Sequence, residues 1–268
     1  MVSTAIEALV QKPHYTVEDL RAIVEVLRSP QGCPWDREQT HESIRKCFLE
    51  EVYEVAEAID HADPAEMREE LGDVLLQVVF HTRLAEEDGW FSWEDVCDEV
   101  CRKMMIRHPH VFGEVTLDAK GNQLREWEAI KDQTHARTSA SDALRAIPRT
   151  LPALMRADKL GKKSRKLGFD WQDAAEAMQK VDEELGEVKE ALQTGRPDRM
   201  EAEFGDLFLA LTTAARLSGV DAEQALTRAC ETYLDRFSGV ERQCAQAGKT
   251  VAETGREELL AYWQAAKG

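Results

Sequence analysis

Two groups of acidic residues are spaced so that the carboxylates of each group can share one site. The first group is Glu51, Glu54, Glu70 and Asp73, and the second is Glu184, Glu187, Glu203 and Asp206. Each group joins a Glu-x-x-Glu to a Glu-x-x-Asp, and the second repeats the first 133 positions later. Residues three apart on a helix share a face, so each motif predicts two carboxylates that point the same way.

A turn between the two halves of each group brings them to the same height. Asp63-Pro64 separates Glu54 from Glu70, and Pro64 suits the first turn of a new helix. At about 1.5 Å per residue, the two halves of an antiparallel helix pair then differ in height by roughly 3 Å. Arg196-Pro197 gives the same register in the second group. We therefore expect four carboxylates to converge at each of two places.

Converging carboxylates repel one another unless cations lie between them. Oxygen ligands favour a hard ion, so we expect all eight acids to be ligands of Mg²⁺, with Mn²⁺ as a substitute. The alternative of solvated surface acids fits poorly with the apolar residues between them, such as Val52 and Leu71. A di-iron site is also disfavoured, because it needs Glu-x-x-His on two helices. The chain has a single copy, from Glu38 to His41.

Two glycines interrupt the helices that carry these acids. Gly72 and Gly205 each lie directly before an aspartate of one group. A glycine in mid-helix costs about 1 kcal/mol relative to alanine. Their presence predicts either a close approach of another helix or room for a ligand.

Helical periodicity runs through most of the chain, and strand-like alternation is nearly absent. Thr16 is placed to cap a helix over residues 17–27, Thr40 to cap the next one, and Ser92 to cap one that runs to Arg107. We predict an all-α fold.

Matches outside the acidic groups also predict a tandem repeat. Gly32-Cys-Pro-Trp35 loosely matches Gly168-Phe-Asp-Trp171, and Trp127 matches Trp263. We predict repeat one over residues 1–135, a linker over 136–150 and repeat two over 151–268. Each repeat is expected to be a helical bundle with a metal site of the four-helix-bundle type.

The composition limits the partners and the compartment. The chain has 34 basic and 51 acidic residues in 268, a formal charge of −17, which disfavours nucleic acids and anionic membranes as partners. No apolar run approaches the roughly 20 residues of a membrane span, and no secretory signal opens the sequence. The six cysteines include no C-x-x-C pair. We expect a cytoplasmic protein whose free thiols are packed as small apolar groups.

Several motifs together resemble the MazG family of nucleoside triphosphate pyrophosphohydrolases, in the all-α pyrophosphatase superfamily. They are the two acidic groups, Gly32-Cys-Pro-Trp-Asp-x-x-Gln-Thr40, Arg107-His-Pro-His-Val-Phe112, Ile147-Pro-x-x-Leu-Pro-Ala-Leu154 and Gly168-Phe-Asp-Trp171. The resemblance covers nearly the whole chain. It implies Mg²⁺-dependent cleavage of NTPs and dNTPs between the α and β phosphates, which yields a monophosphate and pyrophosphate. It also implies a homodimer of intertwined helical bundles.

The positions of the acidic residues suggest separate roles in this chemistry. Glu51 and Glu184 are expected to position the attacking water as well as to bind metal. Glu50 and Glu183, their neighbours, are expected to orient a ligand or a water. Members of the family usually carry Lys-x-x-Arg-Arg on a later helix. Repeat one lacks the first arginine of this stretch, and repeat two keeps only the last.

The basic run Arg156–Lys166 could supply replacement cations, with a solvated helix as an equal alternative. We expect the triphosphate to be bound by Lys103, Arg107, Lys162, Lys163 and Arg236. Because repeat one keeps Lys103 and Arg107, we expect it to be competent, whereas triphosphate binding by repeat two is in doubt.

Four tryptophans are candidates to bind the base: Trp35, Trp127, Trp171 and Trp263. Packing in the core is the alternative for each of them. Two other functions remain open. One is a non-catalytic, nucleotide-binding regulatory protein, and the other is a narrower dUTP or phosphoribosyl-ATP pyrophosphohydrolase.

Overall fold

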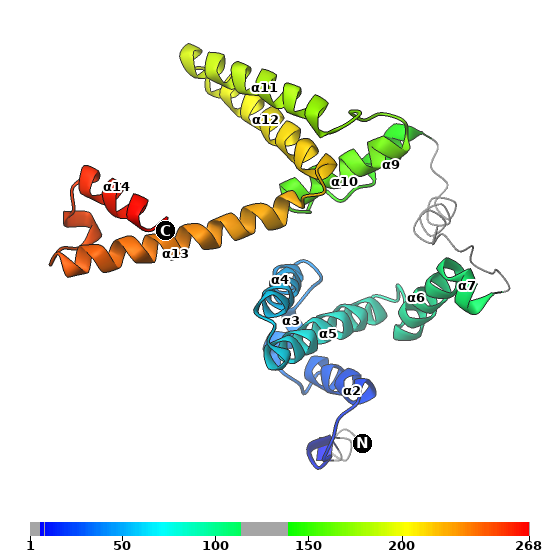
Figure 1. Cartoon of the computed structure of the whole chain (residues 1–268). Coiled ribbons are helices and arrows are strands. Elements are labelled where there is room, and N and C mark those ends of the chain that lie inside the picture. Colours follow the sequence, from blue (N-terminus) through cyan, green and yellow to red (C-terminus); the bar gives the residue numbers. More distant parts are fainter. Residues whose placement is uncertain (1–5, 8, 114–138, 268) are drawn as a thin grey trace. The chain divides into compact units, whose positions relative to one another are not determined.

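The computed structural model describes residues 6–7, 9–113 and 139–267, and every regular element among these residues is a helix. The chain divides into two compact units, residues 1–135 and 136–268. Figure 1 shows the first unit from blue to green and the second from green to red. The predicted all-α fold, with a helical unit for each repeat, is confirmed.

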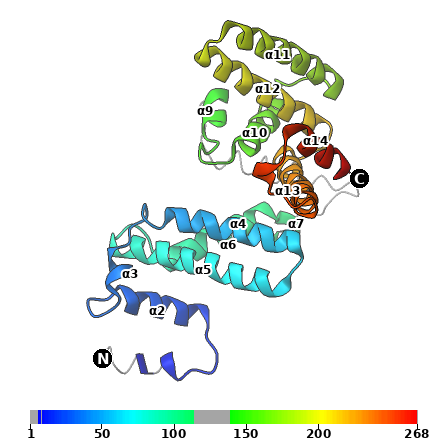
Figure 2. The same ribbon diagram turned by 90° about the vertical axis from the view of Figure 1, so that its left-hand side faces the viewer.

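The first unit is built on an antiparallel helix pair. Its helices are α2 (Val17–Arg28), α3 (Pro34–Glu38), α4 (Arg45–His61), α5 (Pro64–Glu87), α6 (Trp93–Arg107) and α7 (Pro109–Phe112). Helices α4 and α5 lie side by side, and α2 packs against α5 (Figures 1 and 2). The α4–α5 pair carries the first acidic group.

The helix starts follow from local hydrogen bonds. The side chains of Thr16 and Ser92 accept from the backbone N–H groups of Asp19 and Asp95, and those aspartates accept in return, so both predicted caps are confirmed. The prediction for Thr40 was wrong. Its hydroxyl accepts the N–H of Ser43 and closes a separate turn, so that α4 begins at Arg45.

The turn between α4 and α5 matches the prediction. Ala62 ends α4 in the left-handed conformation, with φ of 54°. The Asp63 side chain then accepts from the first N–H groups of α5, and Pro64 lies in the first turn of that helix. In repeat two the residue equivalent to Ala62 is Gly195, with φ of 64°. Glycine adopts this conformation without the steric cost that alanine bears.

The second unit contains a similar helix pair. Its elements are α9 (Ala140–Arg145), α10 (Ala153–Lys166), α11 (Ala174–Thr194), α12 (Pro197–Leu217), α13 (Ala222–Gln246), the 3₁₀ turn η1 (Val251–Glu253) and α14 (Arg256–Ala265). Helices α11 and α12 form the pair that carries the second acidic group, and α10 packs against α12 and α13. Helix α14 packs on α13 (Figure 1). The stretch predicted as a linker contains α9.

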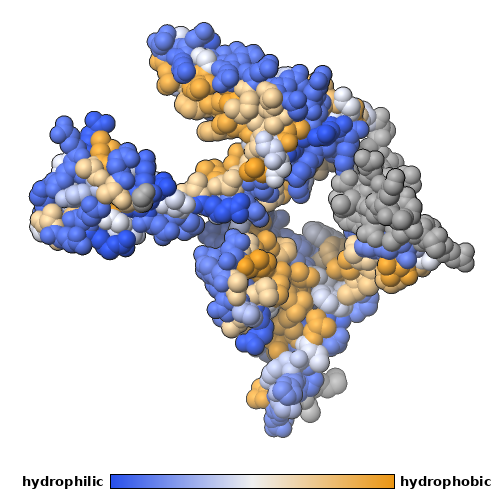
Figure 3. All heavy atoms as spheres, in the orientation of Figure 1, coloured by the Kyte–Doolittle hydropathy of each residue, from blue (hydrophilic) through white to orange (hydrophobic). Residues whose placement is uncertain are grey.

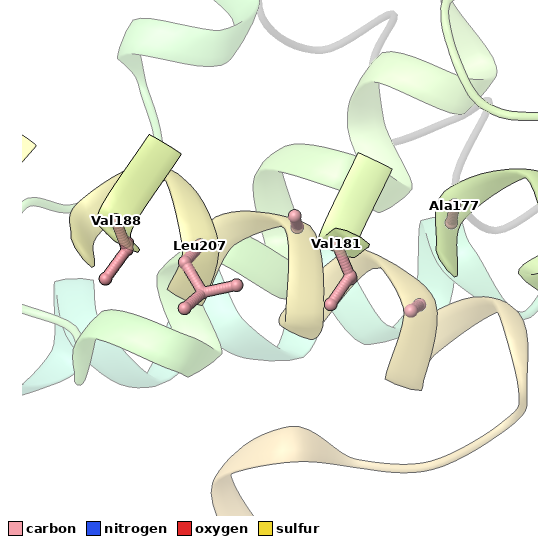
Figure 4. Close-up of a cluster of buried hydrophobic side chains, with 6 residues drawn as sticks. Ala177, Val181, Val188 and Leu207 are labelled. Carbon is pink, nitrogen blue, oxygen red and sulfur yellow. The ribbon is translucent and has the colours of Figure 1, made fainter. Parts of the chain in front are cut away.

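Small buried cores hold these helix pairs together. In the second unit, Ala177, Val181 and Val188 of α11 meet Leu207 of α12 (Figure 4). In the first unit, Val24 of α2 and Ile44 pack against Val79, Phe80 and Leu84 of α5. Each core lies on the same helices as an acidic group. Packing of the apolar side chains therefore fixes the helix rotation that determines where the carboxylates point.

The segment around Trp35 in repeat one and the segment around Trp171 in repeat two are called the tryptophan loops. A buried arginine fixes each loop, but from a different position in each repeat. In repeat one, Arg28 of α2 donates to the carbonyl oxygens of Asp36 and Gln39 and pairs with Glu87 at 2.7 Å. In repeat two, Arg216 of α12 donates to both carboxylate oxygens of Asp170, at 3.0 and 2.7 Å. Both arginine side chains are 7% exposed.

Burial opposes the ionisation of Asp170, but the hydrogen bond and charge of Arg216 outweigh it and lower the pKa of Asp170. The Arg216 guanidinium lies over Gly161 of α10. A Cβ at Gly161 would come 2.6 Å from the Nε of Arg216.

Apolar side chains remain exposed along both helix pairs (Figure 3). In the first unit they include Val52, Leu71 and Leu75, and in the second Leu192, Phe204, Phe208, Leu209 and Leu211.

All six cysteines are free. Cys244 is buried, as expected for a packed thiol, whereas Cys101 and Cys230 are exposed, so that prediction was wrong for these two. Within the described residues, no helix has both the length and the apolar character needed to span a bilayer.

Candidate metal centres

The first acidic cluster consists of Glu51 and Glu54 on α4 and Glu70 and Asp73 on α5. Carboxylate oxygens of Glu51, Glu70 and Asp73 all lie within 4.8 Å of one another. Glu54 shares a hydrogen bond with Glu51. The antiparallel pairing of α4 and α5 thus brings the four predicted residues together.

The charges of the first acidic cluster are mutually unfavourable. Burial raises the pKa of Glu51, and so do the hydrogen bond to Glu54 and the charges of Asp73 and Glu70. Burial also raises the pKa of Glu70, together with the charges of Glu54 and Asp73. A divalent cation between these oxygens would reverse the repulsion.

The second acidic cluster consists of Glu184, Glu187, Glu203 and Asp206, on α11 and α12. Oxygens of Glu184, Glu187 and Glu203 lie within 4.8 Å of one another, whereas Asp206 is outside this set. A hydrogen bond to Glu203 raises the pKa of Glu187, with burial and the charge of Glu184 adding to it. Glu184 is only 5% exposed, and its Oε2 has no hydrogen-bond partner.

An orphaned, buried carboxylate oxygen is costly, and a metal ion is one partner that would satisfy it. The donor sets are all carboxylate, which suits a hard divalent cation such as Mg²⁺ or Mn²⁺. Both clusters therefore fit a metal of this class.

Sequence reasoning missed two cations that accompany the second acidic cluster. Lys180 Nζ lies 2.8 Å from Oε1 of Glu184 and 2.7 Å from Oε1 of Glu183. Arg199 Nε lies 3.3 Å from Oε1 of Glu203. Each cation is four residues before its acid, a spacing that places both side chains on one helix face. The signal was present in the sequence as Lys-x-x-x-Glu and Arg-x-x-x-Glu.

Open space lies beside the glycine of each cluster. A Cβ built on Gly72 or Gly205 would have no heavy atom within 4 Å, apart from neighbouring parts of the same helix. Of the two predicted explanations, close helix approach within the unit was wrong, and room for a ligand remains.

Comparison with known proteins assigns the chain to a family. The model of the MazG nucleotide pyrophosphohydrolase domain matches it twice, over residues 39–112 and 166–240. Each matched segment contains one acidic cluster. The chain belongs to the MazG family.

Full-length relatives agree with this assignment. A protein of Thermotoga maritima named nucleoside triphosphate pyrophosphohydrolase/pyrophosphatase MazG is 43% identical over 94% of this chain and 95% of its own length. The nucleoside triphosphate pyrophosphohydrolase of Escherichia coli K12 is 41% identical over 94% of this chain and 97% of its own. A protein of the same name from Mycobacterium tuberculosis is 31% identical over 92% of this chain and 68% of its own. The two MazG segments thus occur together across these relatives.

The cations predicted to bind phosphate lie on other helices than the acids. Lys103 and Arg107 are on α6, where Lys103 pairs with Glu99 at 3.3 Å. Lys162 and Lys163 are on α10, where Lys162 pairs with Asp158 at 2.7 Å. Arg236 is on α13, which packs against α10, α12 and α14. No described contact joins Lys103, Lys162 or Arg236 to an acidic cluster of this chain.

The neighbours Glu50 and Glu183 are alike in the two repeats of this MazG chain. Each pairs with a lysine, Glu50 with Lys46 at 2.8 Å and Glu183 with Lys180. Both carboxylates are largely exposed, in contrast to Glu184. They are therefore placed beside the clusters rather than inside them.

The candidate base-binding tryptophans differ in their surroundings. Trp35 and Trp171 are exposed, at 61% and 40%, so core packing is wrong for both. Trp263 of α14 packs against Tyr233 of α13, with ring centroids 4.9 Å apart. Trp127 lies outside the described residues.

Proposed function

We propose that this chain hydrolyses nucleoside triphosphates and their deoxy forms between the α and β phosphates, releasing a monophosphate and pyrophosphate. The observation that carries the proposal is the pair of carboxylate clusters, each on a helix pair inside a MazG segment. The names of three MazG relatives support the same activity. The alternatives of a non-catalytic nucleotide-binding protein and of a narrower dUTP or phosphoribosyl-ATP enzyme make different predictions, tested below.

The two clusters would hold Mg²⁺ through Glu51, Glu54, Glu70 and Asp73 and through Glu184, Glu187, Glu203 and Asp206. A bound divalent ion supplies positive charge for the triphosphate and for the charge that develops in the transition state. The carboxylates themselves would hold that charge in place, and the buried contacts within each helix pair support their position.

Glu51 and Glu184 are the carboxylates best suited to act on water. In the proposed step, one of these carboxylates accepts a proton from the water as its oxygen attacks the α phosphorus, and pyrophosphate leaves with the electrons of the broken P–O bond. Glu51 lies in the first cluster beside Glu70 and Asp73, and Glu184 is the buried member of the second. Glu50 and Glu183 would orient these groups.

The remaining roles are the binding of the phosphates and of the base. We propose that Lys103, Arg107, Lys162, Lys163 and Arg236 bind the phosphates, and that Trp35, Trp127, Trp171 and Trp263 enclose the base. A homodimer would allow helices of one copy to approach the clusters of the other. The exposed apolar side chains on α4, α5 and α12 support such a dimer. Light scattering coupled to gel filtration should give twice the monomer mass of 30.3 kDa.

The cysteines and the net charge bear on the compartment and on the partners. Free thiols at all six cysteines support a reducing environment, and we propose the cytoplasm. The net charge of −17 supports small metal-bound polyanions as partners instead of nucleic acids.

The activity is tested by measuring pyrophosphate and orthophosphate release from a panel of NTPs and dNTPs with Mg²⁺. Pyrophosphate release across the panel is expected. Turnover confined to dUTP or phosphoribosyl-ATP would indicate the narrower enzyme. Nucleotide binding by calorimetry without turnover under any divalent metal would indicate the regulatory protein.

Comparing Glu51→Ala with Glu184→Ala assigns the activity to a repeat. We expect a substantial loss in Glu51→Ala, because repeat one keeps Lys103 and Arg107. Glu57→Ala on the same helix is the matched control, because Glu57 is exposed and outside the cluster. Full activity in Glu51→Ala, with loss in Glu184→Ala alone, would refute the assignment.

A further inference from the structure

The two acidic clusters differ in the cations that the chain itself provides. Lys180 lies within 2.8 Å of Glu184, and Arg199 lies within 3.3 Å of Glu203 and 3.6 Å of Glu190. The carboxylates of Glu183 and Glu184 raise the pKa of Lys180, so the lysine is fully charged at neutral pH. The second acidic cluster is therefore partly neutralised by residues of its own helices.

Among the described residues of repeat one, no described ion pair joins a cation to Glu51, Glu54, Glu70 or Asp73. The positions equivalent to Lys180 and Arg199 are Cys47 and Glu66. Glu66 adds a further negative charge on α5, the helix that carries Glu70. The two clusters thus have the same acids at the same spacing but a different net charge.

The contacts of Glu184 show how the lysine and a metal would compete. Its Oε1 accepts from Lys180, while its Oε2 is buried and has no partner. A divalent ion bound to Glu184 would satisfy Oε2, but it would lie close to the ammonium group on the same carboxylate. Two positive charges at this separation repel one another, so the ion must either displace Lys180 or bind more weakly.

We propose that Lys180 is a tethered counter-ion of the second acidic cluster, which stabilises that cluster without metal and weakens its affinity for divalent cations. Arg199 acts in the same direction on Glu203. The first acidic cluster has no described counter-ion of this kind, so it binds the metal more tightly and its stability depends more on the metal. This inference rests on the proposed metal ligands. It makes the two repeats respond to different metal concentrations, with repeat one saturating first.

The test isolates each cluster in the full chain. Glu51→Gln with Glu70→Gln leaves only the second acidic cluster, and Mn²⁺ binding is followed by the electron paramagnetic resonance of the free ion. In that background, Lys180→Met should tighten Mn²⁺ binding about fivefold, equivalent to about 1 kcal/mol. The melting temperature without metal should fall, and the rise caused by Mn²⁺ should increase.

The reciprocal change uses the first acidic cluster. In a chain with Glu184→Gln and Glu203→Gln, Cys47→Lys should weaken Mn²⁺ binding by a similar factor and raise the melting temperature without metal.

Lys189→Met removes an exposed lysine from α11 and is the charge-matched control for Lys180→Met. It should leave Mn²⁺ binding within twofold of its background. Lys180→Gln keeps a polar side chain and serves if the methionine variant does not fold.

The outcomes separate this inference from the proposal on which it rests. Mn²⁺ binding that is present but unchanged by Lys180→Met and by Cys47→Lys would overturn the counter-ion alone. An equal effect of Lys189→Met would also overturn it, because the change would then reflect net charge only. Absence of Mn²⁺ binding in the unsubstituted chain would overturn the metal ligands and the counter-ion together.

Discussion

The glycine beside each acidic cluster provides a test that separates folding from function. Replacing Gly205 by alanine adds one methyl group to an exposed helix interior, and no heavy atom within 4 Å obstructs it. Alanine is favoured over glycine in a helix by about 0.5–1 kcal/mol, so the variant should be more stable than the natural chain. That gain corresponds to a rise of roughly 3 °C in the melting temperature of a domain of this size.

Activity should change in the opposite direction. Glycine occupies this position in both repeats, as Gly72 and Gly205, and we expect the open space beside it to hold part of the nucleotide. A displacement of about 1 Å in such a site can cost up to about 100-fold in rate, and we expect a loss of at least about tenfold. The assay is pyrophosphate release with Mg²⁺, in a chain whose repeat one is silenced by Glu51→Ala, and the activity that remains in that chain is the reference.

Gly186 of α11 is the matched control for Gly205. A Cβ on Gly186 also meets nothing within 4 Å, and the equivalent position in repeat one is Tyr53, which accommodates a large side chain. Gly186→Ala should gain the same stability and keep full activity. If Gly205→Ala is equally stabilised and fully active, the space is not used by a ligand. If Gly205→Ala is destabilised and becomes monomeric, the space belongs to a second copy of the chain.

Three further predictions follow from the fold. Ala62→Gly should stabilise the chain by about 0.5–1 kcal/mol because φ is 54° there, and Gly195→Ala should destabilise it by a similar amount; denaturant unfolding measures both. Arg216→Met should cost about 3 kcal/mol because it leaves the buried Asp170 with only Arg165, 3.9 Å away, as a cation, and the loss should be smaller at a pH low enough to protonate Asp170. Burial and the charge of His41 lower the pKa of His81, so stability should fall as the pH drops below about 6.5, and His81→Gln should remove that slope in thermal melts.

The helix pairs and their acids could be predicted because each depends on local spacing. Apolar periodicity gave the helices, the prolines at positions 64 and 197 gave the turns, and helical register gave the convergence of the carboxylates. The start of α4 was missed because Thr40 hydrogen-bonds within its own turn, a choice that a cap motif alone does not reveal. Local rules therefore predict which residues share a face of a helix.

The cations that contact each acidic cluster were harder to predict than the acids themselves. The sequence predicts replacement phosphate-binding cations in the basic run of α10. In the structure, Lys162 of this run pairs with Asp158 of its own helix. The cations that reach the second acidic cluster are single residues, Lys180 and Arg199, each one helical turn before an acid. Which helices pack around a cluster depends on tertiary contacts, and spacing along the chain does not contain them.

The two repeats have diverged through coupled changes, which limits what can be exchanged between them. Arg28 fixes the tryptophan loop of repeat one, and the match of Gly32 with Gly168 places Ser164 at its position in repeat two. Arg216 fixes the loop of repeat two, and the space for it exists because Gly161 has no side chain. A side chain at Gly161 would collide with Arg216, whereas the corresponding residue of repeat one, Glu25, pairs with Arg83 at 3.6 Å. The loop is therefore held from α2 in repeat one and from α12 in repeat two. The acids differ between the repeats in a similar way. Because Lys180 already supplies positive charge to the second acidic cluster, a metal ion would stabilise that cluster less.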